Sequence, residues 1–178
     1  MAFSEIYRRQ VALLIRTLPL VDEEEVFALK GGTAINLFVR NMPRLSVDID
    51  LTYLPIQDRK ESLAAIDAAL KRIAAHVTKA IPGAHVHTSQ HEDATTKLIV
   101  RSDNVQTIIE VTPVLRGCVY EPKSRSVAAA VEEAFGFAEI KVVSFADLYA
   151  GKMVAAFDRQ HPRDLFDVRE LLSNDGIP

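Results

Sequence analysis

The sequence predicts an α+β fold in which a mixed β-sheet is flanked by helices. Segments with strand-like patterns cluster in the middle of the chain, whereas helical patterns occupy both ends. The chain has 178 residues, of which 48% are hydrophobic and 25% are charged. This length and composition suit one globular domain and exclude collagen-like, low-complexity and largely disordered classes. No stretch approaches the ~18 uninterrupted apolar residues of a membrane span, so no membrane partner is expected.

Hydrophobic spacing and turn residues delimit the elements of the N-terminal half. We expect a helix over 4–19, a strand over 26–30, a helix over 33–40 that Thr33 caps, a strand over 46–54, and a helix over 59–81 that Pro82-Gly83 ends. In the first helix, Ser4 is the expected cap and Pro19 the expected end. Its apolar stripe consists of Ile6, Val11, Leu14, Ile15 and Leu18. The first strand stops at Gly31-Gly32, which predicts a tight turn.

The C-terminal half continues with short strands and then helices. We expect strands over 85–89, 97–101 and 107–114, a loop over 116–126, a helix over 127–135, a strand over 140–143, and helices over 145–158 and 162–172. Ser144 is the expected cap of the first of these last two helices, and Pro162 opens the second as a first-turn residue.

Charge and cysteine content limit the environment and the partners. The formal net charge is −3, so any contact with nucleic acid must come from a local basic patch rather than from the overall field. Cys118 is the only cysteine, so an intrachain disulfide cannot form. This fits a reducing compartment, and a cytoplasmic location is expected.

Two aspartates on one expected strand carry the strongest chemical signal. Gly31-Gly32-Thr33 is followed by Asp48-Ile49-Asp50, and side chains two residues apart on a strand lie on the same face. Two carboxylates at this spacing repel each other unless a cation lies between them, and Mg²⁺ prefers carboxylate oxygens together with substrate phosphates. Glycines let the backbone approach a phosphate closely, and the start of the following helix favours an anion. The competing interpretation is an exposed edge strand with acidic outer positions.

The segment LKGGTAINLFVRNMPRLSVDIDLTY resembles the first motif of the polymerase-β-type nucleotidyltransferase superfamily. More narrowly, it resembles the AbiEii/AbiGii nucleotidyltransferase toxins of bacterial type IV toxin–antitoxin systems, in which the sequence RLSVDIDL is typical. The resemblance implies a polymerase-β-like core with C-terminal helices. It also implies that a nucleoside triphosphate is bound by Gly31, Gly32, Thr33 and Ser46, and that Mg²⁺, or Mn²⁺ in its place, is bound by Asp48 and Asp50.

Two further segments supply candidate catalytic residues. The superfamily uses a third carboxylate from a later strand, and Glu110 in the apolar run 107–111 is the candidate; the alternative is an outward-facing glutamate on an amphipathic strand. The segment SFADLYAGKMVAAFDRQHPRDLFDVREL resembles a second signature of the toxin family. By position, Lys152 is then the lysine that contacts the nucleotide and Asp167 the matching acidic residue. Asp164 is expected to orient Lys152 or Arg163, and the alternative is a surface ladder of salt bridges.

The expected organisation has two parts. Residues 1–143 form a nucleotidyltransferase core with its N-terminal helix, and residues 144–178 form a helical segment that packs on the core and completes the active site. The resemblance implies Mg²⁺-dependent transfer of nucleotides to the 3′ end of tRNA, a block of translation, and a cognate antitoxin as partner.

The residues themselves leave two alternatives to a tRNA-modifying toxin open. In the first, the acceptor is a small molecule such as an aminoglycoside, or a protein hydroxyl; the acidic net charge suits a cationic small acceptor at least as well as RNA. Otherwise the chain is an inactive nucleotidyltransferase fold used as a binding module, although the glycine pair, the two aspartates and Lys152 are all present.

Overall fold

A seven-stranded mixed β-sheet forms the centre of the protein, in the strand order β3-β4-β5-β2-β1-β7-β6. The structure is a computed structural model that describes residues 4–91 and 94–176. Its elements are α1 (Glu5–Asp22), β1 (Phe27–Lys30), α2 (Gly31–Thr33), the π-helix η1 (Ala34–Val39), β2 (Asp48–Tyr53), α3 (Arg59–Ala80), β3 (His85–His91), β4 (Ala94–Ser102), β5 (Val105–Arg116), β6 (Lys123–Ser126), α4 (Ala129–Phe135), β7 (Glu139–Val142), α5 (Phe145–Arg159) and α6 (Pro162–Asn174). The expected α+β class is confirmed.

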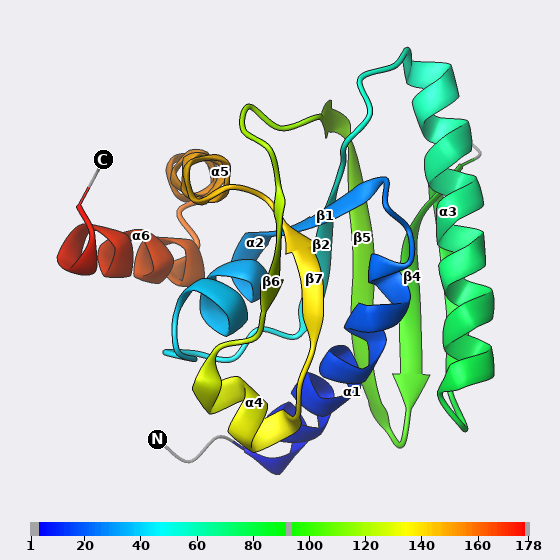
Figure 1. Ribbon diagram of the computed structural model, residues 1–178, viewed down its shortest axis with the longest axis horizontal. Coiled ribbons are helices and arrows are strands. Elements are labelled where there is room, and N and C mark those ends of the chain that lie inside the picture. The colour runs from blue at the N-terminus through cyan, green and yellow to red at the C-terminus, as the bar shows by residue number, and fades with distance from the viewer. Residues whose placement is uncertain (1–3, 92–93, 177–178) are drawn as a thin grey trace.

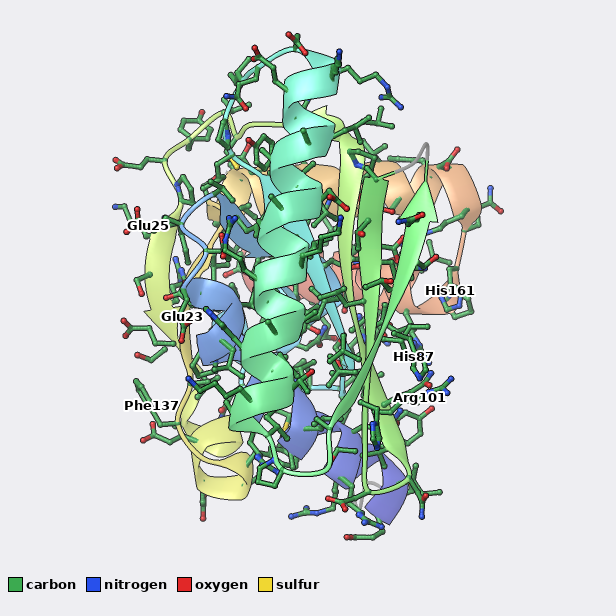
Figure 2. All side chains as sticks on the ribbon, turned by 90° about the vertical axis from the view of Figure 1, so that its right-hand side faces the viewer. Glu23, Glu25, His87, Arg101, Phe137 and His161 are labelled. Carbon is green, nitrogen blue, oxygen red and sulfur yellow. The ribbon has the colours of Figure 1, made fainter. Side chains whose placement is uncertain are left out.

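Helices lie on both sides of this sheet (Figure 1). Helices α1 and α3 pack on one face, where they contact β4, β5 and β7. Figure 2 shows α3 running lengthwise over that face. Helices α5 and α6 contact each other on the opposite side, and α5 also contacts α2. No helix among residues 4–91 and 94–176 is long and apolar enough to cross a membrane.

The central strand β2 joins the two halves of the sheet. It pairs antiparallel with β1 and parallel with β5, so that Asp50 is opposite Lys30 on one side and opposite Glu110 on the other. Ile49 and Leu51 are fully buried in the core, as the alternating pattern predicts. The face on which Asp48 and Asp50 lie is therefore the one turned away from the main core.

The first helix is longer than expected at its C-terminal end. Ser4 caps it by accepting a hydrogen bond from the backbone of Tyr7, as expected. Pro19, the expected end, lies inside the helix, which continues to Asp22. Burial of Val21 in the last turn offsets the one backbone hydrogen bond that a proline removes. Ile6 was expected on the buried stripe but is 66% exposed, because the first turn of the helix lies at the surface.

The turn after β1 differs from the expected capped helix. The helix begins at Gly31, Lys30 occupies the capping position without a side-chain hydrogen bond, and the helical geometry changes to a π-helix from Ala34. Thr33 is therefore not a cap. Its buried hydroxyl instead donates to the backbone carbonyl of Asp48 at 2.5 Å, which ties the turn to β2.

One strand lies in a segment expected to be a loop. β6 spans Lys123–Ser126 and pairs antiparallel with β7, although all four of its residues are exposed. A strand without a buried side carries no apolar alternation, so its pattern is that of a loop. The other expected strands and helices are present, with ends shifted by a few residues; β4 and β5 are extended at both ends.

Candidate active site

Asp48 and Asp50 lie side by side on the face of β2 that is turned away from the main core. Both side chains are partly buried. Burial raises the pKa of both carboxyl groups above the ordinary value, and the charge of Asp48 raises the pKa of Asp50 further. Lys30 acts against the rise at Asp50. The pair thus holds negative charge at an energetic cost that a bound cation would remove.

The two aspartates fit a metal that takes its other ligands from a substrate. Within the described part of the chain, no three His, Cys, Asp or Glu side chains come together as a metal site. A closed cage of protein ligands is therefore not formed here. Mg²⁺ is commonly held by one or two carboxylates together with substrate phosphates and water, and Asp48 and Asp50 suit that arrangement.

The glycine pair at the end of β1 brings backbone close to these aspartates. Gly31 has a φ of +74°, which favours glycine, and a Cβ added there would lie 2.4 Å from Oδ2 of Asp50. A Cβ on Gly32 would lie 2.8 Å from a guanidinium nitrogen of Arg44 and 3.1 Å from the hydroxyl of Ser46. The structure therefore brings together Gly31, Gly32 and Ser46, three of the residues expected to bind phosphate.

Thr33 is placed differently from the other expected phosphate-binding residues. Its side chain is fully buried, and its hydroxyl is engaged by the carbonyl of Asp48. Only its backbone can face a ligand, so its hydroxyl serves to fix the position of the first aspartate.

Glu110 lies on the same face as the aspartates. It is opposite Asp50 in the parallel pairing of β2 and β5. Its carboxylate forms an ion pair with Lys97 of β4 at 3.0 Å, and its side chain is 47% exposed. The side chain is therefore exposed and also adjoins the acidic pair, and its role as a third carboxylate stays a prediction.

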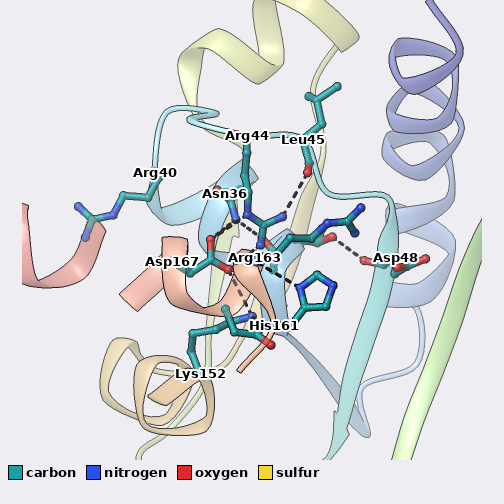
Figure 3. Close-up of polar contacts among 12 residues, drawn as sticks. Asn36, Arg40, Arg44, Leu45, Asp48, Lys152, His161, Arg163 and Asp167 are labelled. Atoms are coloured by element: carbon teal, nitrogen blue, oxygen red, sulfur yellow. Dashed lines mark hydrogen bonds and ion pairs between the residues drawn. The ribbon is translucent and has the colours of Figure 1, made fainter. Parts of the chain in front are cut away.

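Asp167 is the centre of a buried ionic cluster that joins α6 to the turn after β1 (Figure 3). Its side chain is 1% exposed and receives hydrogen bonds from Nε and Nη2 of Arg44 at 2.9 and 2.5 Å. The amide of Asn36 donates to the same carboxylate at 3.1 Å and also to the carbonyl of Gly32 at 2.9 Å. Asp167 therefore acts on the glycine pair through Asn36 and Arg44.

Lys152 of α5 is held by two carboxylates of α6. Its ammonium nitrogen lies 2.8 Å from Asp164 and 3.3 Å from Asp167. Arg159 also binds Asp164, at 2.8 Å. Burial would raise the pKa of Asp164, but the hydrogen bonds and charges of Lys152 and Arg159 bring that pKa below its ordinary value. Asp164 thus orients Lys152, one of the two expected roles, and the ladder is buried rather than on the surface.

The aspartate face and α5 enclose a cavity of about 330 Å³. It is lined by Lys30, Gly31, Asp50, Glu110, Thr112, Asp147, Leu148, Gly151, Lys152, Ala155 and Arg159. Gly31, Asp50, Glu110 and Lys152 are thereby brought to one space. Asp167 does not line it and lies behind Lys152.

Three residues near the site have contacts that the sequence pattern does not reveal. Lys30 faces the cavity from the end of β1, next to Asp50. Arg44 and Asn36 hold Asp167. The available signal was a charged residue at the end of an apolar strand for Lys30 and an amide inside an apolar helix for Asn36, and neither identifies a partner.

Comparisons with known proteins assign the chain to a family. The sequence profile described as "Nucleotidyl transferase AbiEii toxin, Type IV TA system" matches residues 12–178. No curated protein shows significant sequence similarity to the chain. Among solved structures, the crystal structure of ANT(2")-Ia in complex with adenylyl-2"-tobramycin aligns with a TM-score of 0.49 and 16% identity, over 93% of this chain and 88% of that chain. The match of the profile over nearly the whole sequence shows that the chain belongs to the AbiEii family of nucleotidyl transferase toxins of type IV toxin–antitoxin systems.

Proposed function

We propose that this nucleotidyltransferase moves a nucleotide from a Mg²⁺-bound nucleoside triphosphate to the 3′ end of tRNA and thereby blocks translation. The observation that supports this most strongly is the meeting of Gly31, Asp50, Glu110 and Lys152 around one cavity, with Asp48 beside Asp50. Membership of a toxin–antitoxin family implies a nucleoside triphosphate as substrate and an antitoxin as partner.

The chain's own residues would bind and orient the triphosphate. The absence of side chains at Gly31 and Gly32 lets phosphate oxygens approach the backbone. Lys152 offers a fixed positive charge to the phosphates, because Asp164 and Asp167 hold its ammonium group in place. Asp48 and Asp50 would hold the metal ion. When bound, Mg²⁺ supplies neutralisation of the phosphate charge and polarisation of the reacting phosphorus.

The proposed transfer is a displacement at the α-phosphorus. The oxygen of the acceptor's hydroxyl attacks the α-phosphorus, the bond from that phosphorus to the oxygen bridging to the β-phosphate breaks, and pyrophosphate leaves. Glu110 accepts the proton of the hydroxyl, since its carboxylate is exposed and adjoins the aspartates. Lys97 pairs with that carboxylate and keeps it oriented.

The charges around Asp48 favour an anionic acceptor. Burial and, to a lesser extent, the charge of Glu110 raise the pKa of Asp48, and the positive charges of Arg163 and Lys97 act against this rise from two different elements. Figure 3 shows Arg163 reaching toward Asp48 from α6. In a chain of net charge −3, such local cations are what an RNA end requires.

A transfer assay tests this proposal. Purified protein, Mg²⁺ and each α-labelled nucleoside triphosphate in turn are incubated with total bacterial tRNA, with an aminoglycoside mixture, or with a bacterial protein extract. We expect label in tRNA with the intact protein and none with Asp48→Ala. Label only in aminoglycosides or protein would contradict the RNA acceptor, and full activity of Asp48→Ala would contradict the role of the acidic pair.

A further inference from the structure

A second cavity, of about 380 Å³, adjoins the one described above. The two share Lys30, Asp147 and Gly151, so they are continuous along the space between β1 and α5. The lining of the second cavity includes the apolar side chains of Ile56, Val119 and Val143 and the polar side chains of Lys30 and Thr52. Apolar side chains with a few polar groups are the usual lining of a site for a small organic group.

Thr52 lies on the same face of β2 as the two aspartates and lines this second cavity. It follows Asp48 and Asp50 at the same two-residue spacing, so it lies on their face, about 7 Å beyond Asp50 along the strand. The residue is only 6% exposed. Its hydroxyl makes no hydrogen bond with any residue in the described ranges, although it lines the cavity. The hydroxyl oxygen is not among the fully buried unpaired atoms of the described residues, so it keeps accessible surface on the cavity side and can hydrogen-bond a ligand there.

Gly151 lies opposite, inside helix α5, and lines both cavities. Glycine is unfavourable in a helix interior and is retained there where something must approach the backbone closely. No protein atom explains this glycine, because a Cβ added at this position would meet nothing within 4 Å. The space beside it is therefore open to a ligand that spans both cavities.

The outer wall of the second cavity is held in place by α5. The carboxylate of Asp147 accepts hydrogen bonds from the backbone N–H groups of Val119 and Tyr120 at 2.9 and 3.1 Å, and from the hydroxyl of Ser144 at 2.6 Å. The loop after β5 is thus fastened to the first turn of the helix. The cavity is formed before any ligand binds, which reduces the conformational cost of binding.

Lys30 stands where the two cavities meet. Its side chain is partly buried, and within the described part of the protein it has no ion pair or hydrogen bond. Asp50 is its partner in the β1–β2 pairing, and the charge of Asp50 acts against the lowering of the Lys30 pKa by burial. Lys30 thus lies at the boundary of the two cavities, where the phosphates of a nucleotide in the first cavity would join a group in the second.

We propose that the nucleoside part of the nucleoside triphosphate occupies the second cavity, hydrogen-bonded by the Thr52 hydroxyl and lying against Gly151, while its phosphates occupy the first. This assignment rests on the proposed nucleotidyl transfer and adds the position of the sugar and base. Thr52 and Gly151 are then binding residues for the nucleotide and not for the acceptor.

Equilibrium binding without an acceptor tests this assignment. Calorimetry in Mg²⁺ buffer compares α,β-methylene analogues of the four nucleoside triphosphates, which cannot be cleaved at the reacting position, with inorganic tripolyphosphate, which has no nucleoside. We expect Thr52→Val and Gly151→Leu to weaken binding of the preferred analogue by about tenfold or more and to leave tripolyphosphate binding within about twofold of the wild-type value. Ala150→Leu adds the same side chain to the same helix at an exposed position outside both cavities, and it should bind both ligands as the wild type does.

Each outcome is informative about a different claim. Unchanged binding of the analogue by both variants, or equal weakening of analogue and tripolyphosphate, would overturn the assignment while leaving nucleotidyl transfer in place. A wild-type protein that binds neither ligand would contradict the proposed function itself. Thermal unfolding distinguishes a loss of binding from a loss of folding. Gly151→Ala should raise the Tm by about 2–4 °C, because alanine has the higher helix propensity, and should still weaken binding of the analogue.

Discussion

Replacing Asp167 by asparagine should destabilise the protein strongly. Asp167→Asn keeps the shape of the side chain but leaves Arg44 without its partner carboxylate and leaves Lys152 with Asp164 alone, which Arg159 also binds. Removing one partner from a buried ion pair generally costs about 3–5 kcal/mol. We expect the lower end, about 3 kcal/mol, because the side chain of Arg44 is 17% exposed and can regain water, and because Lys152 keeps its ion pair with Asp164.

Urea unfolding followed by circular dichroism measures this loss. For a slope of about 2 kcal/mol per molar urea, the midpoint should fall by about 1.5 M. Asp158→Asn removes an exposed carboxylate from the end of α5 and should change the unfolding free energy by less than about 0.5 kcal/mol. Adding Arg44→Gln to Asp167→Asn should recover part of the loss, because the unpaired cation is then gone.

Two results would contradict this role of Asp167. A loss below about 1 kcal/mol would mean that the ionic cluster does not hold α6 against the turn after β1. Full stability together with abolished transfer would mean that Asp167 acts directly in the chemistry rather than by positioning Lys152.

The acidic pair and the glycine turn lead to three further predictions. Asp50→Asn should raise the Tm of the metal-free protein, because burial and the charge of Asp48 raise the pKa of Asp50, so its negative charge opposes folding. The same variant should lower transfer by at least about a hundredfold, because a carboxylate that would hold the metal ion is lost. A lower Tm would contradict this. Burial raises the pKa of Asp48 and Asp50 above 3.8, so the free energy of unfolding should decline as the pH rises from 3.8 through these pKa values. The kcat/KM for the nucleotide should rise over the same pH range, because the carboxylates become ionised. An acid limb of the kcat/KM profile centred at or below pH 3.8 would contradict the raised pKa values. Gly31→Ala should lower the free energy of unfolding by about 1 kcal/mol more than Gly83→Ala does. Both glycines have a φ of +74°, but only at Gly31 would the new Cβ meet the carboxylate of Asp50. Equal losses in urea unfolding would disprove the close approach of Gly31 to Asp50.

The fold and the acidic pair are predictable because local patterns determine them. The alternation along β2 shows which face Asp48 and Asp50 occupy, since side chains on a strand alternate by geometry alone. The limits of α3 follow from the capping Asp58 and from the Pro82-Gly83 stop. Burial of the intervening strand residue Ile49 follows from the same alternation.

The partners within the site are not predictable, because they depend on long-range packing. The sequence of β5 alone does not predict that Glu110 is opposite Asp50, because this register depends on the strand order of the whole sheet. The spacing of Asp164 and Asp167 places them on one helix face, but which cations reach them depends on how α6 docks. Their interpretation as a surface ladder fails at Asp167 for the same reason, since burial is a property of the packed protein.

The position of the label that is transferred distinguishes nucleotidyl transfer from other reactions of a nucleoside triphosphate. The protein is incubated with Mg²⁺, tRNA and its preferred nucleoside triphosphate labelled at either the α- or the γ-phosphate, alongside the Asp48→Ala variant. We expect the α-label to enter RNA and the γ-label to leave in pyrophosphate, and we expect the variant to do neither. Entry of the γ-label into any acceptor, or transfer of the α-label by the variant at the wild-type rate, would contradict this expectation.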